Sequence, residues 1–273
     1  MKLALADETK TFLDTYAKNL PQAILLSGPV GIGLKTLALH MANTNGVLLE
    51  IVEPLAKTKA AVPAITVERV RLLYETARSK MGRPHFIVID NAETMNAAAQ
   101  NALLKLLEEP NDSTKFILTS HRPDALLPTI RSRLQPYVVP RINSAASSRL
   151  VRSLGPPDAT RSRQLLYIAS GLPAELTRLS SNGDDFKQLA ERVSLARQFV
   201  EGSQYQKQVT IQALKDDRQA ALVFIETTLL ILKRSLNADS SIGLLHLIDA
   251  LLGAQEAIRA NGNIRLHLTA AVL

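Results

Sequence analysis

The stretch that decides the fold is QAILLSGPVGIGLKTLALHMAN, from Gln22 to Asn43. It opens with a short apolar run, passes through a glycine-rich turn that contains Gly28, Gly31 and Gly33, and ends in residues with the spacing of a helix. A strand, a glycine loop and a helix in this order are the context of a phosphate-binding loop, which reads G-x-x-x-x-G-K-S/T. The stretch therefore predicts the first unit of an α/β domain.

The loop departs from that pattern at the two positions that matter most for nucleotide binding. Leu34 stands where the lysine belongs, and Lys35 stands where the magnesium-binding hydroxyl belongs. A leucine cannot neutralise a phosphate, and a lysine in the place of a metal ligand repels the metal. A one-residue bulge could instead deliver Lys35 and Thr36 to the usual places, but only by opening the first helical turn. The loop is predicted to be degenerate, with residual nucleotide binding as the open alternative.

A second apolar run, PHFIVIDNAE from Pro84 to Glu93, predicts a buried strand that ends in Asp90. In a working ATPase of this kind the acid at this point handles magnesium, and a glutamate directly after it activates water. Here Asn91 follows, and a neutral amide is a poor general base near neutral pH. Glu93 is expected to be aimed elsewhere by the intervening turn. The two losses together predict no intrinsic ATPase activity and no cofactor of the chain's own.

The order of apolar runs predicts three parts along the chain. Strands alternate with helices over residues 1–140, which indicates a parallel sheet covered by helices on both faces. One of these helices is predicted over 65–80. Four of its aliphatic residues are expected to face a core: Val67, Val70, Leu72 and Leu73. Residues 141–185 predict a small helical unit, and residues 186–273 predict a helical bundle.

Composition excludes several classes of protein. The chain has 273 residues, of which 46% are hydrophobic and 21% charged, as in ordinary globular proteins. It contains no cysteine, which excludes a disulfide framework and thiolate zinc sites. No apolar run approaches the roughly 20 residues that span a bilayer, and the N-terminus lacks the features of a signal peptide. A cytoplasmic protein is the expectation.

A longer run, FIVIDNAETMNAAAQNALLKLLEEPNDSTKFILTSHRPDALLPTIRSRL, covers residues 86–134. It resembles the AAA+ clamp-loader subunits of bacterial DNA polymerase III, for which NALLKLLEEP followed by a Ser-Arg pair is highly specific. The likeness is strong over about residues 20–140 and weaker beyond, except at AIRANGNIRLHL near the C-terminus. The resemblance implies an AAA+ α/β domain with a degenerate phosphate loop, a helical lid and an all-α collar domain for oligomerisation.

The resemblance also implies roles for particular residues. The motor subunits of the family, gamma/tau, keep the lysine, the threonine and the Asp-Glu pair, whereas another subunit type has often lost them but keeps the Ser-Arg pair, here Ser132 and Arg133. In the family that arginine contacts the γ-phosphate of ATP on the neighbouring subunit, where its permanently charged fork stabilises the transferring phosphoryl group. The lid arginine of the motor subunits is matched here by Ala174.

The implied partners are gamma/tau-type and delta-type subunits in a pentameric ring, and through that ring the sliding clamp and primer-template DNA. ATP and magnesium would be bound by the partner subunits. Most members carry a four-cysteine zinc module, and its absence here removes zinc from the expected ligands. The alternatives are an active gamma/tau-like ATPase whose phosphate loop departs from the consensus and, in another class, a stand-alone basic nucleic-acid-binding protein.

The distribution of charge bears on that last alternative. The formal net charge is +7, and residues 122–163 carry eight arginines against only Asp124 and Asp158. A basic segment of this kind is compatible with a solvated surface, with packing against neighbouring subunits, or with contact to DNA. Stand-alone DNA binding would be recognised by its strong dependence on salt.

Overall fold

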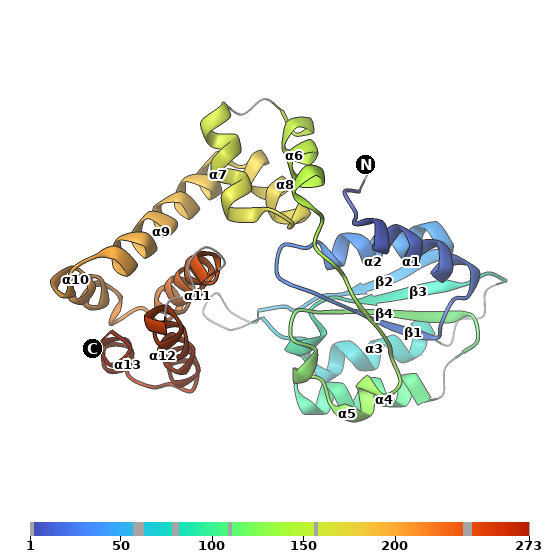
Figure 1. Ribbon diagram of the computed structural model, residues 1–273. Helices are drawn as coiled ribbons and strands as arrows, with labels where there is room; N and C mark the ends of the chain where they lie inside the picture. The colour runs from blue at the N-terminus through green and yellow to red at the C-terminus, as the bar shows by residue number, and fades with distance from the viewer. Residues whose placement is uncertain are drawn as a thin grey trace. The chain divides into compact units, whose positions relative to one another are not determined.

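The computed structural model describes residues 3–56, 63–77, 82–108, 111–155, 158–236 and 242–272. It divides into two compact units, Met1–Ser181 and Asn182–Leu273. The first unit contains a sheet with its covering helices and three further helices, and the second is built from helices in its described part (Figure 1). The finer division of the chain at residues 140 and 185 stays a prediction.

Five parallel strands form the sheet, in the order β2-β3-β4-β1-β5. The strands are β1 (Ala23–Ser27), β2 (Val47–Val52), β3 (His85–Ile89), β4 (Thr114–Ser120) and β5 (Gln135–Val138). All residues of β1 and β3 are buried, as expected for strands covered on both faces. The predicted α/β fold is confirmed.

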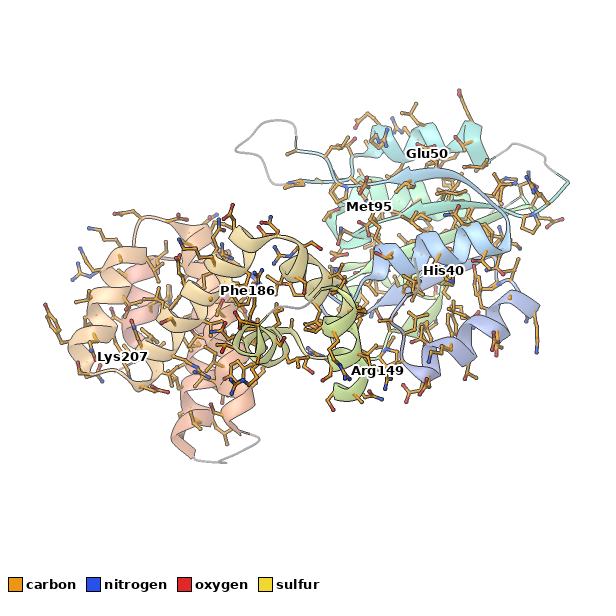
Figure 2. All side chains as sticks on the ribbon, turned by 90° about the horizontal axis from the view of Figure 1, so that it is seen from above. His40, Glu50, Met95, Arg149, Phe186 and Lys207 are labelled. Atoms are coloured by element: carbon orange, nitrogen blue, oxygen red, sulfur yellow. The ribbon has the colours of Figure 1, made fainter. Side chains whose placement is uncertain are left out.

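Helices lie against both faces of the sheet (Figure 1). The covering helices are α1 (Asp7–Lys18), α2 (Leu34–Asn45), α3 (Val67–Ala77) and α4 (Ala97–Glu108). Because side chains alternate along a strand, Ile24 and Leu26 pack in the core beneath α1 and α2, while Leu25 packs in the core beneath α3 and α4. The outer side of α2 is polar and carries the exposed His40 (Figure 2).

The prediction that all four aliphatic residues of α3 face the core was wrong for one of them. Val70 and Leu73 are fully buried, but the side chain of Leu72 is 57% exposed. Successive residues on an α-helix are rotated by about 100°, so Leu72 lies about 200° from Val70 and turns away from the sheet.

Short elements connect the strands, and three helices complete the first unit. The connections contain the 3-10 turns η1 (Ala92–Thr94) and η2 (Pro123–Ala125) and the short helix α5 (Pro128–Arg131). The further helices, called the lid here, are α6 (Ser144–Ser153), α7 (Ala159–Ala169) and α8 (Pro173–Ser181). Side-chain caps define where the first two lid helices begin, since Asn143 accepts from the Ala146 N–H at 2.8 Å and Asp158 from the Arg161 N–H at 2.7 Å.

The second unit is a helical bundle with its own core, as the sequence predicts. Its helices are α9 (Gly183–Glu201), α10 (Gln204–Leu214), α11 (Arg218–Leu236), α12 (Ile242–Arg259) and α13 (Ile264–Ala270). Phe199 and Phe224 meet edge to face in this core, with their ring centroids 5.0 Å apart. Among the helices of the described ranges, none is both long and apolar enough to cross a membrane.

Two glycines provide a test of the packing. A Cβ atom on Gly46, between α2 and β2, would lie 2.1 Å from the carbonyl oxygen of Pro84, whereas a Cβ on Gly253, inside α12, would meet nothing within 4 Å. We expect Gly46→Ala to lower the free energy of unfolding by about 1–3 kcal/mol through overpacking. Gly253→Ala should raise it by about 0.5–1 kcal/mol, because alanine favours the helix. Urea titrations followed by circular dichroism measure both, and an unchanged Gly46→Ala protein would contradict the structure.

Candidate functional site

The glycine loop connects β1 to α2 at the carboxyl edge of the sheet. Gly31 and Gly33 have φ angles of +85° and +95°, in the left-handed region that favours glycine, and Gly33 occupies the N-cap of α2. Strand, loop and helix thus follow one another as the sequence predicts. This is the place in a parallel sheet where phosphate groups are usually held.

The first turn of α2 is closed and regular. The Leu37 N–H donates to the carbonyl of Gly33 at 2.9 Å, and Leu34 is the first helical residue. The side chain of Leu34 is only 2% exposed and packs in the core beneath α2. The one-residue bulge that would move Lys35 and Thr36 into the usual positions is therefore not formed in this structure.

Because the first turn of α2 is regular, the side chains of Lys35 and Thr36 do not take the usual lysine and hydroxyl positions of a phosphate-binding loop. The ammonium group of Lys35 forms an ion pair with the carboxylate of Glu53, which follows the end of β2. Thr36 is exposed and lines a cavity between the loop and the lid. The lysine charge is thus directed to a carboxylate of the same chain.

The lid contacts the glycine loop directly. The N–H of Glu175, in the first turn of α8, donates to the carbonyl of Gly31 at 3.0 Å. A Cβ atom on Gly31 would lie only 2.7 Å from the Cβ of Glu175. A Cβ on Gly33 would lie 3.4 Å from the Cβ of Ala174, the residue that the resemblance matches to the lid arginine of the motor subunits. The start of α8 is therefore fitted onto the loop at its glycines.

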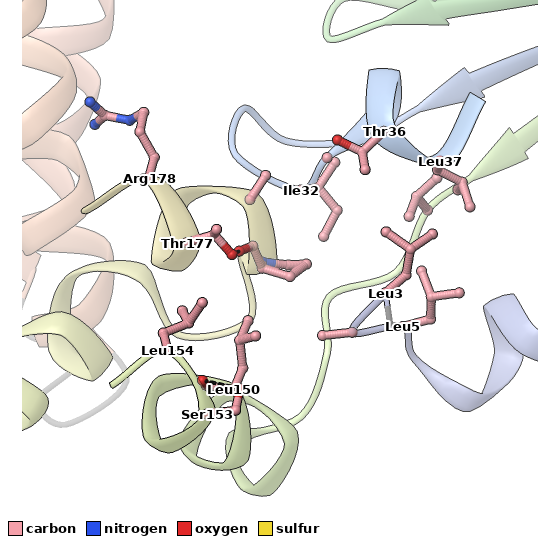
Figure 3. Close-up of a pocket in the computed structure, with 15 residues that line it drawn as sticks. Leu3, Leu5, Ile32, Thr36, Leu37, Leu150, Ser153, Leu154, Thr177 and Arg178 are labelled. Atoms are coloured by element: carbon pink, nitrogen blue, oxygen red, sulfur yellow. Dashed lines mark hydrogen bonds between the residues drawn. The ribbon is translucent and has the colours of Figure 1, made fainter. Parts of the chain in front are cut away.

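An apolar cavity of about 540 Å³ lies beside this contact (Figure 3). Its walls come from the N-terminal segment, the start of α2, α6 and α8, and include Leu5, Ile32, Leu150 and Leu154. Among the described residues that line it, Arg178 is the one with a charged side chain. The size suits a small organic group, but the lining is poor in the cations that phosphates require.

Arg178 was not identified from the sequence. It lies one helical turn after Ala174, and its guanidinium holds the carboxylate of Glu175 with two hydrogen bonds of 3.0 and 2.8 Å. The Glu-x-x-Arg spacing on a predicted helix is the signal that could have indicated this pair. Its charge is directed to the same residue whose backbone contacts the loop.

Asp90 and Asn91 follow β3 at the same edge of the sheet. One carboxylate oxygen of Asp90 accepts from the Thr119 hydroxyl at 2.6 Å, and the other accepts from the Asn91 side-chain amide at 3.0 Å. The backbone N–H of Asn91, whose φ angle is +52°, donates to the same hydroxyl at 3.0 Å. The structure therefore places the acid at the same edge of the sheet as the loop, where Thr119 and Asn91 already hold both of its oxygens.

Glu93 and His121 connect this region to the glycine loop. One oxygen of the Glu93 carboxylate accepts from the backbone N–H of His121 at 3.0 Å. Nδ1 of the same histidine lies 2.8 Å from the carbonyl of Gly28, and because a carbonyl only accepts, this nitrogen carries the proton. Glu93 thus braces the end of β4. Sequence reasoning missed His121 because the five histidines are scattered along the chain.

Within the described ranges, no group of three or more histidine, aspartate or glutamate side chains is arranged to hold a metal ion.

Arg133 lies at the opposite edge of the sheet. It lies two positions before β5. Gln135 at the start of that strand pairs with Ile24, whereas Val138 at its end pairs with Ser27. The glycine loop begins directly after Ser27, so about 10 Å of strand separates the two edges. The structure therefore places Ser132 and Arg133 away from the chain's own loop.

The guanidinium of Arg133 is held by two acceptors. It donates to the carboxylate of Glu108, the last residue of α4, at 2.8 Å and to the carbonyl of Thr129 at 2.9 Å. The hydroxyl of Ser132 donates to the same carbonyl at 3.0 Å. Arg131 instead forms an ion pair of 2.8 Å with Asp124. Arg131, at the end of α5, and Arg133, just beyond it, thus have separate acidic partners.

Gln100 fixes the segment that leads to this arginine. Its side chain is buried, donates to the carbonyls of Met95 and Ala125 at 3.1 and 3.2 Å, and accepts from the Leu127 N–H at 2.7 Å. It therefore ties α4 to the turn before α5. The eight arginines of residues 122–163 are distributed from this turn to α7, and their contact with DNA stays a prediction.

Comparisons with known proteins show which proteins the chain is similar to. The profile of the family described as "DNA polymerase III, delta subunit" matches residues 47–143. DNA polymerase III subunit delta' of Pseudomonas aeruginosa is 34% identical over 184 residues, which make up 59% of this chain and 56% of that protein. The chain resembles the delta-prime subunits of bacterial DNA polymerase III. The delta-prime subunit of Bacillus subtilis is also 34% identical, over 53% of this chain and 42% of that protein.

The resemblance inferred from the sequence is thus confirmed, although the chain spans only about half the length of these delta-prime relatives. DNA polymerase III subunit gamma/tau of Mycobacterium tuberculosis is 32% identical over 39% of this chain and 19% of that protein. Among solved structures, a DNA polymerase III gamma subunit-related protein from Thermotoga maritima has a TM-score of 0.55 at 19% identity over 97% of both chains. The RuvB Holliday junction branch migration motor of that organism has a TM-score of 0.51 at 13% identity, over 72% of this chain and 76% of that one. The fold is that of the AAA+ proteins, as predicted.

The contact between lid and loop can be tested with two glycines of left-handed conformation. Gly31→Ala adds backbone strain and a clash with Glu175, whereas Gly155→Ala, at a φ angle of +120° with nothing within 4 Å, adds strain alone. We expect the Glu175 amide proton to exchange at least about tenfold faster in Gly31→Ala, because each loss of about 1.4 kcal/mol in local stability gives that factor. Exchange at Glu175 should be unchanged in Gly155→Ala. Equal exchange in the two variants would mean that the lid does not rest on the loop.

Proposed function

We propose that the chain is a delta-prime-type subunit of the DNA polymerase III clamp loader, which helps to load the sliding clamp onto primed DNA in the cytoplasm without hydrolysing ATP itself. The observation that carries the proposal is the position of Arg133. It lies at the edge of the sheet opposite the glycine loop, which supports a role on an ATP held by another subunit and not on one held by this chain.

The contacts around the glycine loop support the absence of intrinsic ATPase activity. Phosphoryl transfer needs a cation on the phosphates, a magnesium ligand and a group that orients water. Leu34 is buried, Lys35 is paired with Glu53, and Asn91 takes the place of the water-activating glutamate. The acid nearest in sequence, Glu93, holds the backbone of His121. At each of these positions the chain therefore has a residue whose chemistry is unsuitable or whose side chain is bound to another group.

The chemistry of arginine supports a role for Arg133 on a partner's ATP. The guanidinium is always charged and carries five N–H donors in a planar fork, two of which bond Glu108 and Thr129. Its remaining donors are available to a phosphate at an interface, and its side chain is 38% exposed. Ser132 would orient the turn through Thr129. The adjoining ATP and its magnesium would be bound by a gamma/tau-type subunit.

The partners proposed are those that the resemblance implies. They are gamma/tau-type and delta-type subunits in a pentameric ring, with the clamp and primer-template DNA reached through that ring. The second unit, which is helical in its described part and has its own core, would serve as the collar that joins the subunits.

A gamma/tau-like ATPase is the second candidate. It is favoured by the identity to gamma/tau subunits and by the cavity beside the loop. It would require Lys35 to leave Glu53 and the closed first turn of α2 to open. Those costs make it the weaker of the two.

Substitution of the two neighbouring arginines tests the proposal. In a complex reconstituted with the gamma/tau-type and delta-type subunits, Arg133→Ala should lower ATP turnover at the adjoining site by on the order of 10³-fold, as for other arginine fingers. Arg131→Ala removes an equally basic residue that is paired with Asp124, and it should leave turnover within about twofold of wild type. Single-turnover hydrolysis of labelled ATP measures both rates. Equal rates in the two variants would refute the role of Arg133.

A further inference from the structure

The ion pair between Arg133 and Glu108 raises a question about how the arginine becomes available. The carboxylate lies 2.8 Å from the guanidinium, at the same exposed turn from which Arg133 would reach a partner's ATP. A γ-phosphate that approaches this guanidinium meets the negative charge of Glu108. Two anions on one cation repel each other, so the carboxylate weakens the pull of Arg133 on the phosphate as long as it stays in place.

We propose that Glu108 is a positioning residue that holds Arg133 in an ion pair in the unassembled chain, an arrangement called parking here. The carboxylate releases Arg133 when the arginine contacts the γ-phosphate on the neighbouring subunit. This inference rests on the proposed function of Arg133. The phosphate carries more negative charge than a carboxylate and offers three acceptor oxygens, so it is the stronger partner for the fork. Parking keeps the free chain from exposing an unpaired arginine.

The second contact of Arg133 explains why its guanidinium keeps its orientation when the Glu108 carboxylate leaves. The carbonyl of Thr129 accepts from the other terminal nitrogen of the guanidinium at 2.9 Å. A neutral carbonyl does not repel a phosphate, and Thr129 lies in the short helix α5, four residues before the arginine. Orientation is therefore maintained by Thr129, and Glu108 acts as a competitor of the phosphate.

Exposure makes the exchange feasible. The side chains of Arg133 and Glu108 are 38% and 43% exposed, and ion pairs of this kind are weak in water. Glu108 is also the last residue of α4, where the negative end of the helix disfavours a carboxylate and increases the benefit of a nearby arginine. The pair is thus strong enough to hold the free arginine and weak enough to yield to a phosphate.

Removal of the competing charge tests the proposal in the reconstituted complex. In Glu108→Gln and Glu108→Ala, a larger fraction of Arg133 is free to engage, and the apparent affinity for a ligand rises with the fraction of the competent state. The KM for ATP should therefore fall by about two- to fivefold, the range that corresponds to an exposed ion pair, with kcat unchanged. A role in stability alone would not produce a lower KM.

Asp124 provides the matched control, because its pair with Arg131 has the same 2.8 Å length and involves an arginine only two residues from Arg133. Asp124→Asn should leave KM and kcat unchanged. If Arg133→Ala leaves turnover unaffected, the proposed function itself is wrong. If Arg133→Ala lowers turnover but the Glu108 variants leave KM unchanged or raise it, the parking role is wrong and the proposed function stands.

Discussion

Parallel strands give a sheet two chemically different edges, and the account of this chain depends on which edge each residue reaches. The glycine loop, Asp90 and Asn91 all follow strand ends and meet at the carboxyl edge. Arg133 precedes β5 and lies at the other edge, next to the end of α4. One chain can therefore carry a loop region at one edge and, at the other, the arginine proposed to serve a neighbour's site, without any change of fold.

At the carboxyl edge, groups that serve nucleotides in working ATPases are used to hold this chain together. The charge of Lys35 is directed to Glu53, the carboxylate of Asp90 to Thr119 and Asn91, and the carbonyl of Gly31 to the N–H of Glu175. Each contact is modest by itself, but together they commit these groups to partners within the chain. The lid is thereby joined to the loop by contacts within the chain, and nucleotide is not required to bring them together.

The sequence predicts the fold well because its signals are local. Apolar runs and the glycines of the loop each act within a few residues. The contacts that shape the site are not local. His121 bonds Gly28 from 93 positions away, and no pattern along the chain indicates that pair. Leu72 was also mispredicted. Its apolar side chain is typical of a core residue, but its angular position on α3 turns it to solvent.

The most direct test of the central claim is calorimetric titration of the purified chain with ATP and magnesium up to millimolar concentration. Because Leu34 is buried and the charge of Lys35 is directed to Glu53, the account predicts no detectable heat of binding. Binding in the micromolar range would contradict it. The loop would then have to open its first turn, and Lys35 and Thr36 would hold the nucleotide as they do in a motor subunit.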